Sequence, residues 1–147
     1  MTPYLIITDE MTHALTLAAK RGVDVRIITP GIPDKKPIYS VTRSFYHGLV
    51  KDGVRVYEWT PGFCHAKMSV ADDCMATCGT INLDYRSLYH HFENGCFMTE
   101  CDAVRDIRND LQETMKECRE VTEKYRTGRS AYLRLGQLFM RLFAGLL

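Results

Sequence analysis

This sequence lacks several features that mark particular classes of protein. Cysteine is sparse, with six residues among 147, and no two of them form a CxxC pair. That spacing excludes a dense disulfide scaffold and the common zinc patterns. The first residues have no basic segment before a long apolar run, and no apolar stretch is long enough to span a bilayer. We therefore expect free thiols, a reducing compartment, no signal peptide and no membrane span.

An excess of charge of one sign is also missing. The chain has 19 basic and 18 acidic residues, which give a net charge of +1. Such a balance does not favour a nucleic-acid partner. With 46% hydrophobic and 25% charged residues, the composition is that of an ordinary folded protein and excludes a disordered or collagen-like chain. The length predicts one domain over residues 1–147.

Acidic residues are absent after Glu123, although five basic residues follow it. Residues 1–123 consequently carry a net charge of −4. At helical spacing, the apolar residues of 130–147 form one stripe: Leu135, Leu138, Phe139, Leu142 and Leu146. We predict a basic amphipathic helix over 130–147, which either packs on the core or contacts an anionic lipid surface.

The first half of the chain alternates between strand and helix patterns. Strand-like segments at 4–7, 23–29 and 54–59 are separated by helical apolar spacing, and Thr8 is a candidate N-cap. Residues 32–37 read as a loop. This order predicts right-handed βαβ units and a mixed, mostly parallel sheet flanked by helices, which is an α/β fold.

The second half has a different pattern. Residues 65–71 and 74–78 form a candidate β-hairpin, because a two-aspartate turn signal separates them. Another apolar run at 94–99 predicts a strand. Apolar residues then recur at helical spacing from 102 to 125, which predicts one long helix.

Three polar side chains in the hairpin region suggest a phosphate site. His65 and Lys67 are separated by one residue and would project from the same face of a strand. If the hairpin forms, Asn82 returns beside them. The lysine offers charge, the asparagine offers donors, and the imidazole is a nucleophile or proton carrier.

The spacing of His65, Lys67 and Asp72 resembles the HxKxxxxD signature of the phospholipase D superfamily. Gly-Thr-Ile-Asn at 79–82 is similar to the GSxN element that follows it, with Thr80 in place of serine. Nearly the whole chain is similar to the C-terminal half of bacterial cardiolipin synthases. The membrane helices and first HxKxxxxD motif of that family are absent, so the resemblance implies a fragment or a half that must pair.

The resemblance implies a role for each matched residue. His65 would act as the acid/base or as the nucleophile, in a mechanism that passes through a phosphohistidine. Lys67, Thr80 and Asn82 would hold the phosphate oxygens, and Glu93 would orient the histidine of the opposing half. Asp72 belongs to the catalytic motif, although its place at a strand end favours a structural role. The mechanism requires no metal and no cofactor.

The implied reaction is phosphatidyl transfer between two phosphatidylglycerols, with release of glycerol. The implied partners are phosphatidylglycerol, an anionic lipid surface, and a second motif-bearing half or a second copy of the chain, with no nucleic acid. The implied location is the cytoplasmic face of the cell membrane. Two alternatives stay open: a homodimeric phosphodiesterase or nuclease of the same superfamily, and a catalytically silent half that pairs and docks on the membrane.

Overall fold

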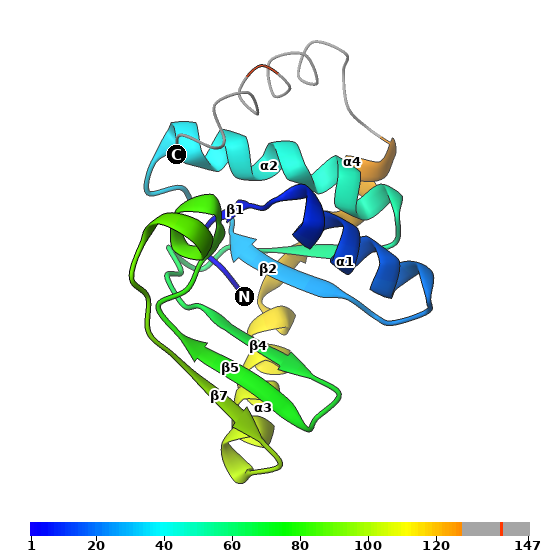
Figure 1. Ribbon diagram of the computed structural model, residues 1–147. Helices are drawn as coiled ribbons and strands as arrows, with labels where there is room; N and C mark the ends of the chain where they lie inside the picture. Colours follow the sequence, from blue (N-terminus) through cyan, green and yellow to red (C-terminus); the bar gives the residue numbers. More distant parts are fainter. Residues whose placement is uncertain (128–138, 140–147) are drawn as a thin grey trace.

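The computed structural model describes residues 1–127 and residue 139 of the chain (Figure 1). The predicted helix over 130–147 lies outside the described residues, apart from Phe139. Helices and both parallel and antiparallel strands occur together, which confirms the α/β class and the mixed strand arrangement. Within the described residues, no helix combines the length and apolarity that crossing a membrane requires.

The first half follows the predicted alternation. Its elements are β1 (Leu5–Ile6), α1 (Asp9–Lys20), β2 (Arg26–Pro30), α2 (Lys36–Lys51) and β3 (Arg55–Trp59). The side chain of Thr8 accepts a hydrogen bond from the Met11 amide at 3.2 Å and so caps α1, as predicted. Strands β2 and β3 pair in parallel, which confirms the βαβ arrangement. The predicted loop at 32–37 is shorter than expected, because α2 already begins at Lys36.

The second half begins with a hairpin. Its elements are β4 (Met68–Ala71), β5 (Met75–Gly79), β6 (Leu83–Asp84), the π-helical turn η1 (Arg86–His90), β7 (Gly95–Thr99), α3 (Asp102–Lys116), β8 (Cys118–Glu120) and α4 (Thr122–Thr127). Strands β4 and β5 pair antiparallel, as predicted. Asp72 and Asp73 form the turn with φ of 47° and 58°, in the left-handed region that aspartate tolerates better than most residues.

The strands form three small sheets, ordered β1-β6, β2-β3-β8 and β4-β5-β7. Two of the five strand pairings within residues 1–127 are parallel and three are antiparallel. Parallel pairing therefore holds for the βαβ region, and it does not predominate over the described residues. Thr2 Oγ1 accepts a hydrogen bond from the Leu83 amide, which helps to tie the start of the chain to β6.

The prediction of one long helix over 102–125 is wrong. Its apolar stripe is real, but its residues pack on opposite faces of the β2-β3-β8 sheet. Leu111 of α3 belongs to a cluster with Ile28 and Tyr57, whereas Tyr125 of α4 belongs to the cluster around α2. One straight helix cannot cover both faces. The chain instead leaves α3 after Lys116 and forms β8, which pairs antiparallel with β3.

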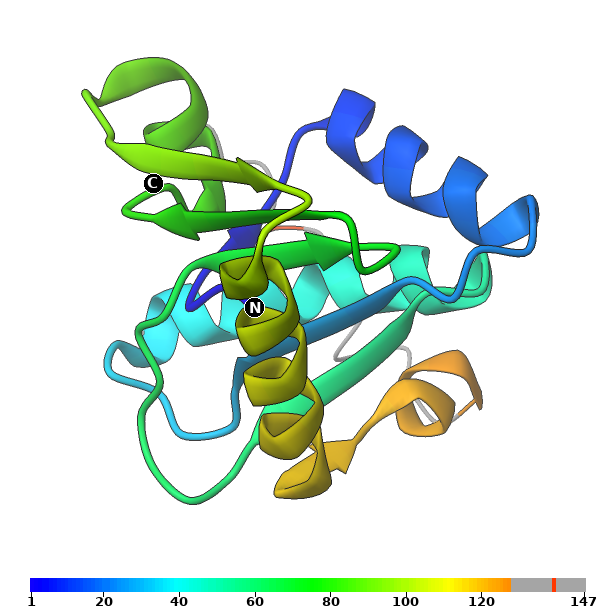
Figure 2. The same ribbon diagram turned by 90° about the horizontal axis from the view of Figure 1, so that it is seen from below.

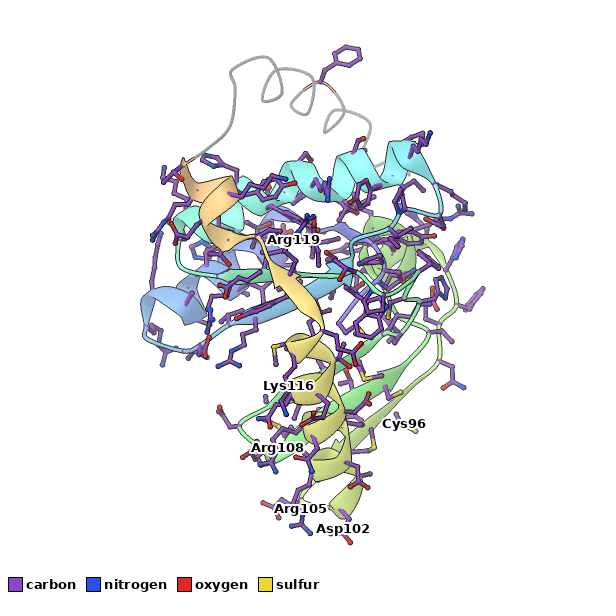
Figure 3. The ribbon with its side chains drawn as sticks, turned by 180° about the vertical axis from the view of Figure 1, so that it is seen from behind. Cys96, Asp102, Arg105, Arg108, Lys116 and Arg119 are labelled. Atoms are coloured by element: carbon purple, nitrogen blue, oxygen red, sulfur yellow. The ribbon has the colours of Figure 1, made fainter. Side chains whose placement is uncertain are left out.

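The core consists of two layers of side chains on either side of the strands. Helices α1 and α2 cover one side, and α3 crosses the other (Figures 1 and 2). The larger cluster joins β1, β2, α2 and β3 and includes the fully buried Leu5, Val41 and Leu49. The back view shows α3 running away from β8 along the β4-β5-β7 sheet, with Arg105 and Asp102 at its far end (Figure 3).

Candidate active site

His65 and Lys67 lie in the extended segment that leads into β4. The backbone carbonyl of Lys67 accepts a hydrogen bond from the Gly79 amide at 3.2 Å, which anchors the segment to the end of β5. The rings of Tyr4 and Phe63 flank the exposed imidazole, at centroid distances of 6.2 Å and 5.9 Å. The hairpin and two aromatic rings thus position the histidine.

The structure brings His65 and Lys67 into direct contact. Lys67 Nζ lies 2.7 Å from His65 Nδ1 and 3.3 Å from Nε2, and it donates to the His65 carbonyl oxygen at 2.9 Å. An ammonium group has donors only, so the imidazole nitrogen that it contacts serves as the acceptor. A cation and an imidazole therefore occupy one surface, as the spacing predicted.

Lys67 lies in a partly buried, electrostatically mixed environment. Desolvation lowers the pKa of its amine below the usual value, while the negative charges of Glu93 and Asp84 act in the opposite direction. The side chain consequently stands near two carboxylates that would compete with an anionic ligand.

Thr80 and Glu93 form a second polar group. The Thr80 hydroxyl donates a short hydrogen bond to Glu93 Oε2 and accepts one from the Asn94 amide at 2.9 Å. The hydrogen bond from Thr80, followed by one from Ser87, lowers the pKa of the Glu93 carboxyl. Glu93 is therefore held as a carboxylate by the residue that stands in place of the family's serine.

Glycine at position 79 permits this arrangement. A Cβ atom there would lie 2.3 Å from the Asn94 carbonyl oxygen and 2.6 Å from the Gly95 Cα. Both are backbone atoms and could not move aside cheaply. Only glycine lets the end of β5 approach the start of β7 so closely, which brings Thr80 within reach of Glu93.

Asn82 and Glu93 line the same cavity, which has a volume of about 260 Å³. Asn82 Oδ1 is buried there without a hydrogen-bond partner among the described residues. The other polar or charged residues that line this cavity are Tyr4, Lys35, Asp84, Arg86, Ser87 and His91. Sequence reasoning missed Lys35 as a site residue, because no spacing signal links the residue before α2 to residues beyond β6.

Two further groups in this cavity have defined contacts. Arg86 Nε donates to His91 Nε2 at 2.9 Å. Tyr4 donates to Asp34 Oδ2 at 2.6 Å, and burial, reinforced by that bond, raises the pKa of its phenol to about 12. Tyr4 is therefore a neutral hydroxyl beside His65 near neutral pH.

Asp72 is not brought together with the other motif residues. It occupies the turn at the far end of β4, whereas Lys67 directly precedes the first residue of that strand. The neighbouring Asp73 accepts an ion pair from Arg108 of α3 at 2.6 Å. The structure therefore forms two pairs of site residues, His65 with Lys67 and, separately, Thr80 with Glu93. Asp72 stays apart from both pairs, in the hairpin turn.

Comparison with known proteins identifies the family of this chain. Residues 1–115 match the family model described as cardiolipin synthase, phospholipase D-like domain. The chain is 51% identical over 147 residues to an uncharacterized protein of Streptococcus mutans and 34% identical over 146 residues to cardiolipin synthase 2 of Bacillus cereus. These matches cover 100% and 99% of this chain, but only 32% and 28% of the length of the two relatives. The chain thus spans about a third of their length.

Solved structures share the fold. Phosphatidylserine synthase of Haemophilus influenzae superposes with a TM-score of 0.73 at 17% identity, over 99% of this chain and 38% of that one. The phospholipase D family member Nuc of Salmonella typhimurium superposes with a TM-score of 0.69 at 18% identity, over 82% and 78%. The family model covers residues 1–115, which are most of this chain. The chain therefore belongs to the cardiolipin synthase family of phospholipase D-like domains.

Proposed function

We propose that this chain supplies half of an active site that transfers a phosphatidyl group from one phosphatidylglycerol to the hydroxyl of another, with release of glycerol. The observation that carries the proposal is the 2.7 Å contact between His65 Nδ1 and Lys67 Nζ. Membership of the family and the names of its curated relatives support the phospholipid substrate.

The proposed chemistry has two displacements at phosphorus. One imidazole attacks the phosphodiester, a P–N bond forms, and the P–O bond to the leaving glycerol breaks. A second imidazole protonates that oxygen and then removes the proton from the incoming hydroxyl, which attacks the phosphohistidine and releases the first imidazole. If this chain pairs with a different motif-bearing half, His65 takes the acid/base role. If two copies of this chain pair, His65 can take either role.

The other site residues act on the phosphate and on the opposing histidine. Lys67 balances charge on the non-bridging oxygens, and the amide of Asn82 supplies a hydrogen bond. The Thr80 hydroxyl has a single proton, so it would exchange its bond to Glu93 for one to a phosphate oxygen when substrate binds. The role proposed for Glu93 is to accept a hydrogen bond from the histidine of the opposing half and so fix the tautomer of that imidazole. The role proposed for Asp72 is structural, in the turn between β4 and β5. Charge on phosphorus is balanced by lysine and imidazole, so these steps assign no role to a metal or cofactor.

The first test measures anion binding. Lys67→Ala is expected to weaken orthovanadate binding by roughly tenfold or more, because a charged hydrogen bond contributes about 1.5–3 kcal/mol. Binding is followed by isothermal titration calorimetry. The control is Lys51→Ala, which removes an exposed lysine at the end of α2. Equal vanadate affinity in the Lys67 and Lys51 variants would remove Lys67 from the site.

The second test concerns the lipid surface, which we place at the cytoplasmic face of the membrane. The tail after Glu123 carries five basic residues, and each is expected to contribute about 1 kcal/mol near an anionic surface. The chain should sediment with phosphatidylglycerol vesicles at low salt, and not with neutral vesicles. Replacing Arg129, Arg134 and Arg141 by glutamine should abolish sedimentation and leave the apolar stripe intact. Equal binding to neutral vesicles would contradict the electrostatic proposal.

A further inference from the structure

The pairing of β5 with β7 places two cysteines opposite each other. Cys78 of β5 and Cys96 of β7 are register partners in this antiparallel ladder. Both side chains are exposed, and both thiols are free. Opposite partners on neighbouring strands project their side chains from the same face of a sheet. The two thiols therefore lie side by side in space, although they are distant in the sequence.

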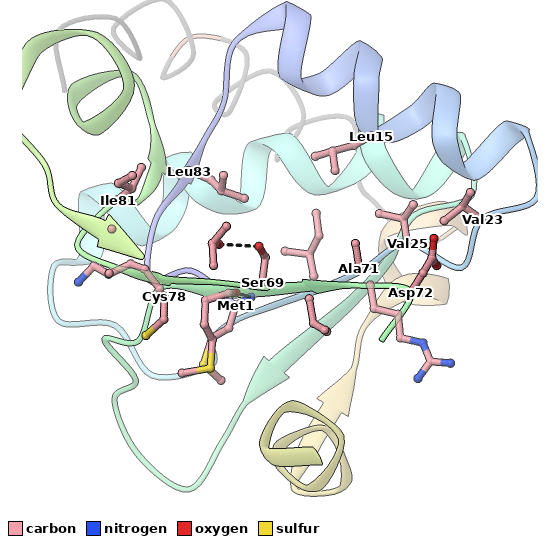
Figure 4. A pocket seen from close by; sticks show the side chains of 18 of the residues that line it. Met1, Leu15, Val23, Val25, Ser69, Ala71, Asp72, Cys78, Ile81 and Leu83 are labelled. Carbon is pink, nitrogen blue, oxygen red and sulfur yellow. Dashed lines mark hydrogen bonds between the residues drawn. The ribbon is translucent and has the colours of Figure 1, made fainter. Parts of the chain in front are cut away.

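These thiols lie on the face of the β4-β5-β7 sheet that α3 partly covers. Figure 4 shows Cys78 on the opposite side of the sheet from Ser69, whose hydroxyl lies 2.6 Å from that of Thr77. On the same face as Cys78, Ala76 is buried, and α3 contacts both β5 and β7. The helix leaves the next pair open, since Cys96 is exposed and lies to one side of α3 (Figure 3). Small oxidants and small thiols can therefore reach both sulfur atoms.

The ladder sets the separation of the two cysteines. The Thr80 amide donates to the Asn94 carbonyl at 2.8 Å, which makes these residues a hydrogen-bonded pair. Such pairs recur at every second position, so Cys78 and Cys96 form the next one, with Cα atoms about 5.5 Å apart. A disulfide spans Cα separations of about 4.4–6.8 Å.

The side chains must move slightly for this bond to form. The Cβ atoms of opposite partners are about 4.5–5.5 Å apart, whereas a disulfide holds them at about 3.5–4.5 Å. The Cβ atoms of Cys78 and Cys96 would consequently approach by about 1 Å. Strain and exposure both make a disulfide easier to reduce, so this bond would be reversible.

The segment between the two cysteines, residues 79–95, holds three residues of the candidate active site: Thr80, Asn82 and Glu93. It leaves the sheet at the end of β5 and returns at the start of β7. A bond between the two thiols would close this segment into a loop at its base. Because a crosslink restricts the opened states of a loop, separation of β5 from β7 would become less favourable.

We propose that Cys78 and Cys96 form a redox-active dithiol, which hydrogen peroxide converts into a reversible disulfide. One thiol attacks a peroxide oxygen and becomes a sulfenic acid, and the other peroxide oxygen leaves as water. The second thiol attacks the sulfenic sulfur, the S–S bond forms, and a second water leaves. The two sulfur atoms thus give two electrons to the peroxide. Two molecules of glutathione return these electrons and restore both thiols, with release of glutathione disulfide.

The test oxidises the full chain with a small excess of hydrogen peroxide. Thiol titration of the denatured protein should show the loss of two of its six thiols. Cyanogen bromide cleaves after Met75 and Met98 and releases residues 76–98, which contain Cys78 and Cys96 and no other cysteine. The mass of this fragment should fall by that of two hydrogen atoms, and millimolar glutathione should reverse the change.

Two variants and two amides sharpen this test. Cys78→Ser should abolish the loss of two hydrogens, whereas the control Cys101→Ser removes an exposed cysteine after β7 and should leave it unchanged. Oxidation should slow hydrogen exchange of the Thr80 amide by about tenfold, because that amide lies beside the crosslink. The Glu100 amide, which donates to Cys74 at the far end of the ladder, should change by less than about twofold.

Three results would overturn the proposal. An unchanged mass of residues 76–98 in a chain that has lost two thiols would assign the bond to other cysteines. Equal oxidation of Cys96 in the wild type and in Cys78→Ser would show two independent thiols. Covalent dimers on a non-reducing gel, without the change in fragment mass, would assign the reaction to separate chains. None of these measurements uses enzymatic activity, so they are independent of the proposed reaction.

Discussion

Replacing His65 by alanine is expected to reduce phosphatidyl transfer by at least about a thousandfold, because a positioned proton carrier alone contributes between about a hundredfold and ten-thousandfold. Lys67 cannot substitute for the exposed imidazole that it contacts, because an ammonium group can donate protons but cannot attack phosphorus at neutral pH. Transfer is measured as glycerol release from phosphatidylglycerol vesicles, with the chain alone and with a second motif-bearing half. His13→Ala, which removes an exposed histidine on α1, should leave the rate unchanged.

Mixing experiments extend this prediction to the half-site. If two copies form one site, each active dimer needs two intact His65 side chains. Activity in mixtures of wild type and the His65→Ala variant should then fall with the square of the wild-type fraction. When this chain is assayed without an added second half, a linear fall would show that each copy works alone, and full activity of a strict monomer would contradict the half-site proposal. If only the added second half restores activity, the dependence is linear in this chain and the partner is a different polypeptide.

Replacing Arg43 by methionine is expected to lower the free energy of unfolding by about 3 kcal/mol. Glu58 of β3 is fully buried and accepts ion pairs from Arg43 at 2.6 Å and Arg119 at 2.7 Å. Arg119 is more than half exposed, so it cannot alone compensate a carboxylate that has lost its water. Urea unfolding followed by circular dichroism gives the value.

Two further variants separate charge from packing. Arg43→Met combined with Glu58→Met removes the buried charge with its partner, and it should recover most of the lost stability. Arg105→Met breaks an exposed pair with Asp102 and should change the free energy of unfolding by less than about 1 kcal/mol. If the double variant is as unstable as Arg43→Met, the loss comes from packing of the arginine stem.

Much of the site could be predicted because its residues are close in sequence. Two residues that are separated by one other residue lie on the same side of an extended chain, and a turn with two aspartates brings the following strand back beside them. His65 and Lys67 are in contact, and the hairpin forms. The cavity around Asn82 could not be predicted in full. Lys35 reaches it from the start of α2, and no local pattern records a contact across that distance.

The error at 102–125 has a similar origin. Apolar spacing reports which residues are buried and does not report against what. Leu111 and Tyr125 are both buried, as predicted, but on opposite faces of a sheet. The deciding contribution is the pairing of β8 with β3, reinforced by Arg119 and Glu58. That pairing depends on residues about 60 positions away, which a helical pattern cannot reveal.

The tie between β1 and β6 has a consequence for the time course of folding. Thr2 and Leu83 are 81 positions apart, and Tyr4, two residues after Thr2, flanks His65 and lines the cavity around Asn82. Closing a loop of that length carries its entropy cost before any contact repays it, so contacts of this range form slowly. The hairpin with Lys67 should fold early and the complete pocket late. A refolding chain should therefore regain secondary structure before it regains vanadate binding.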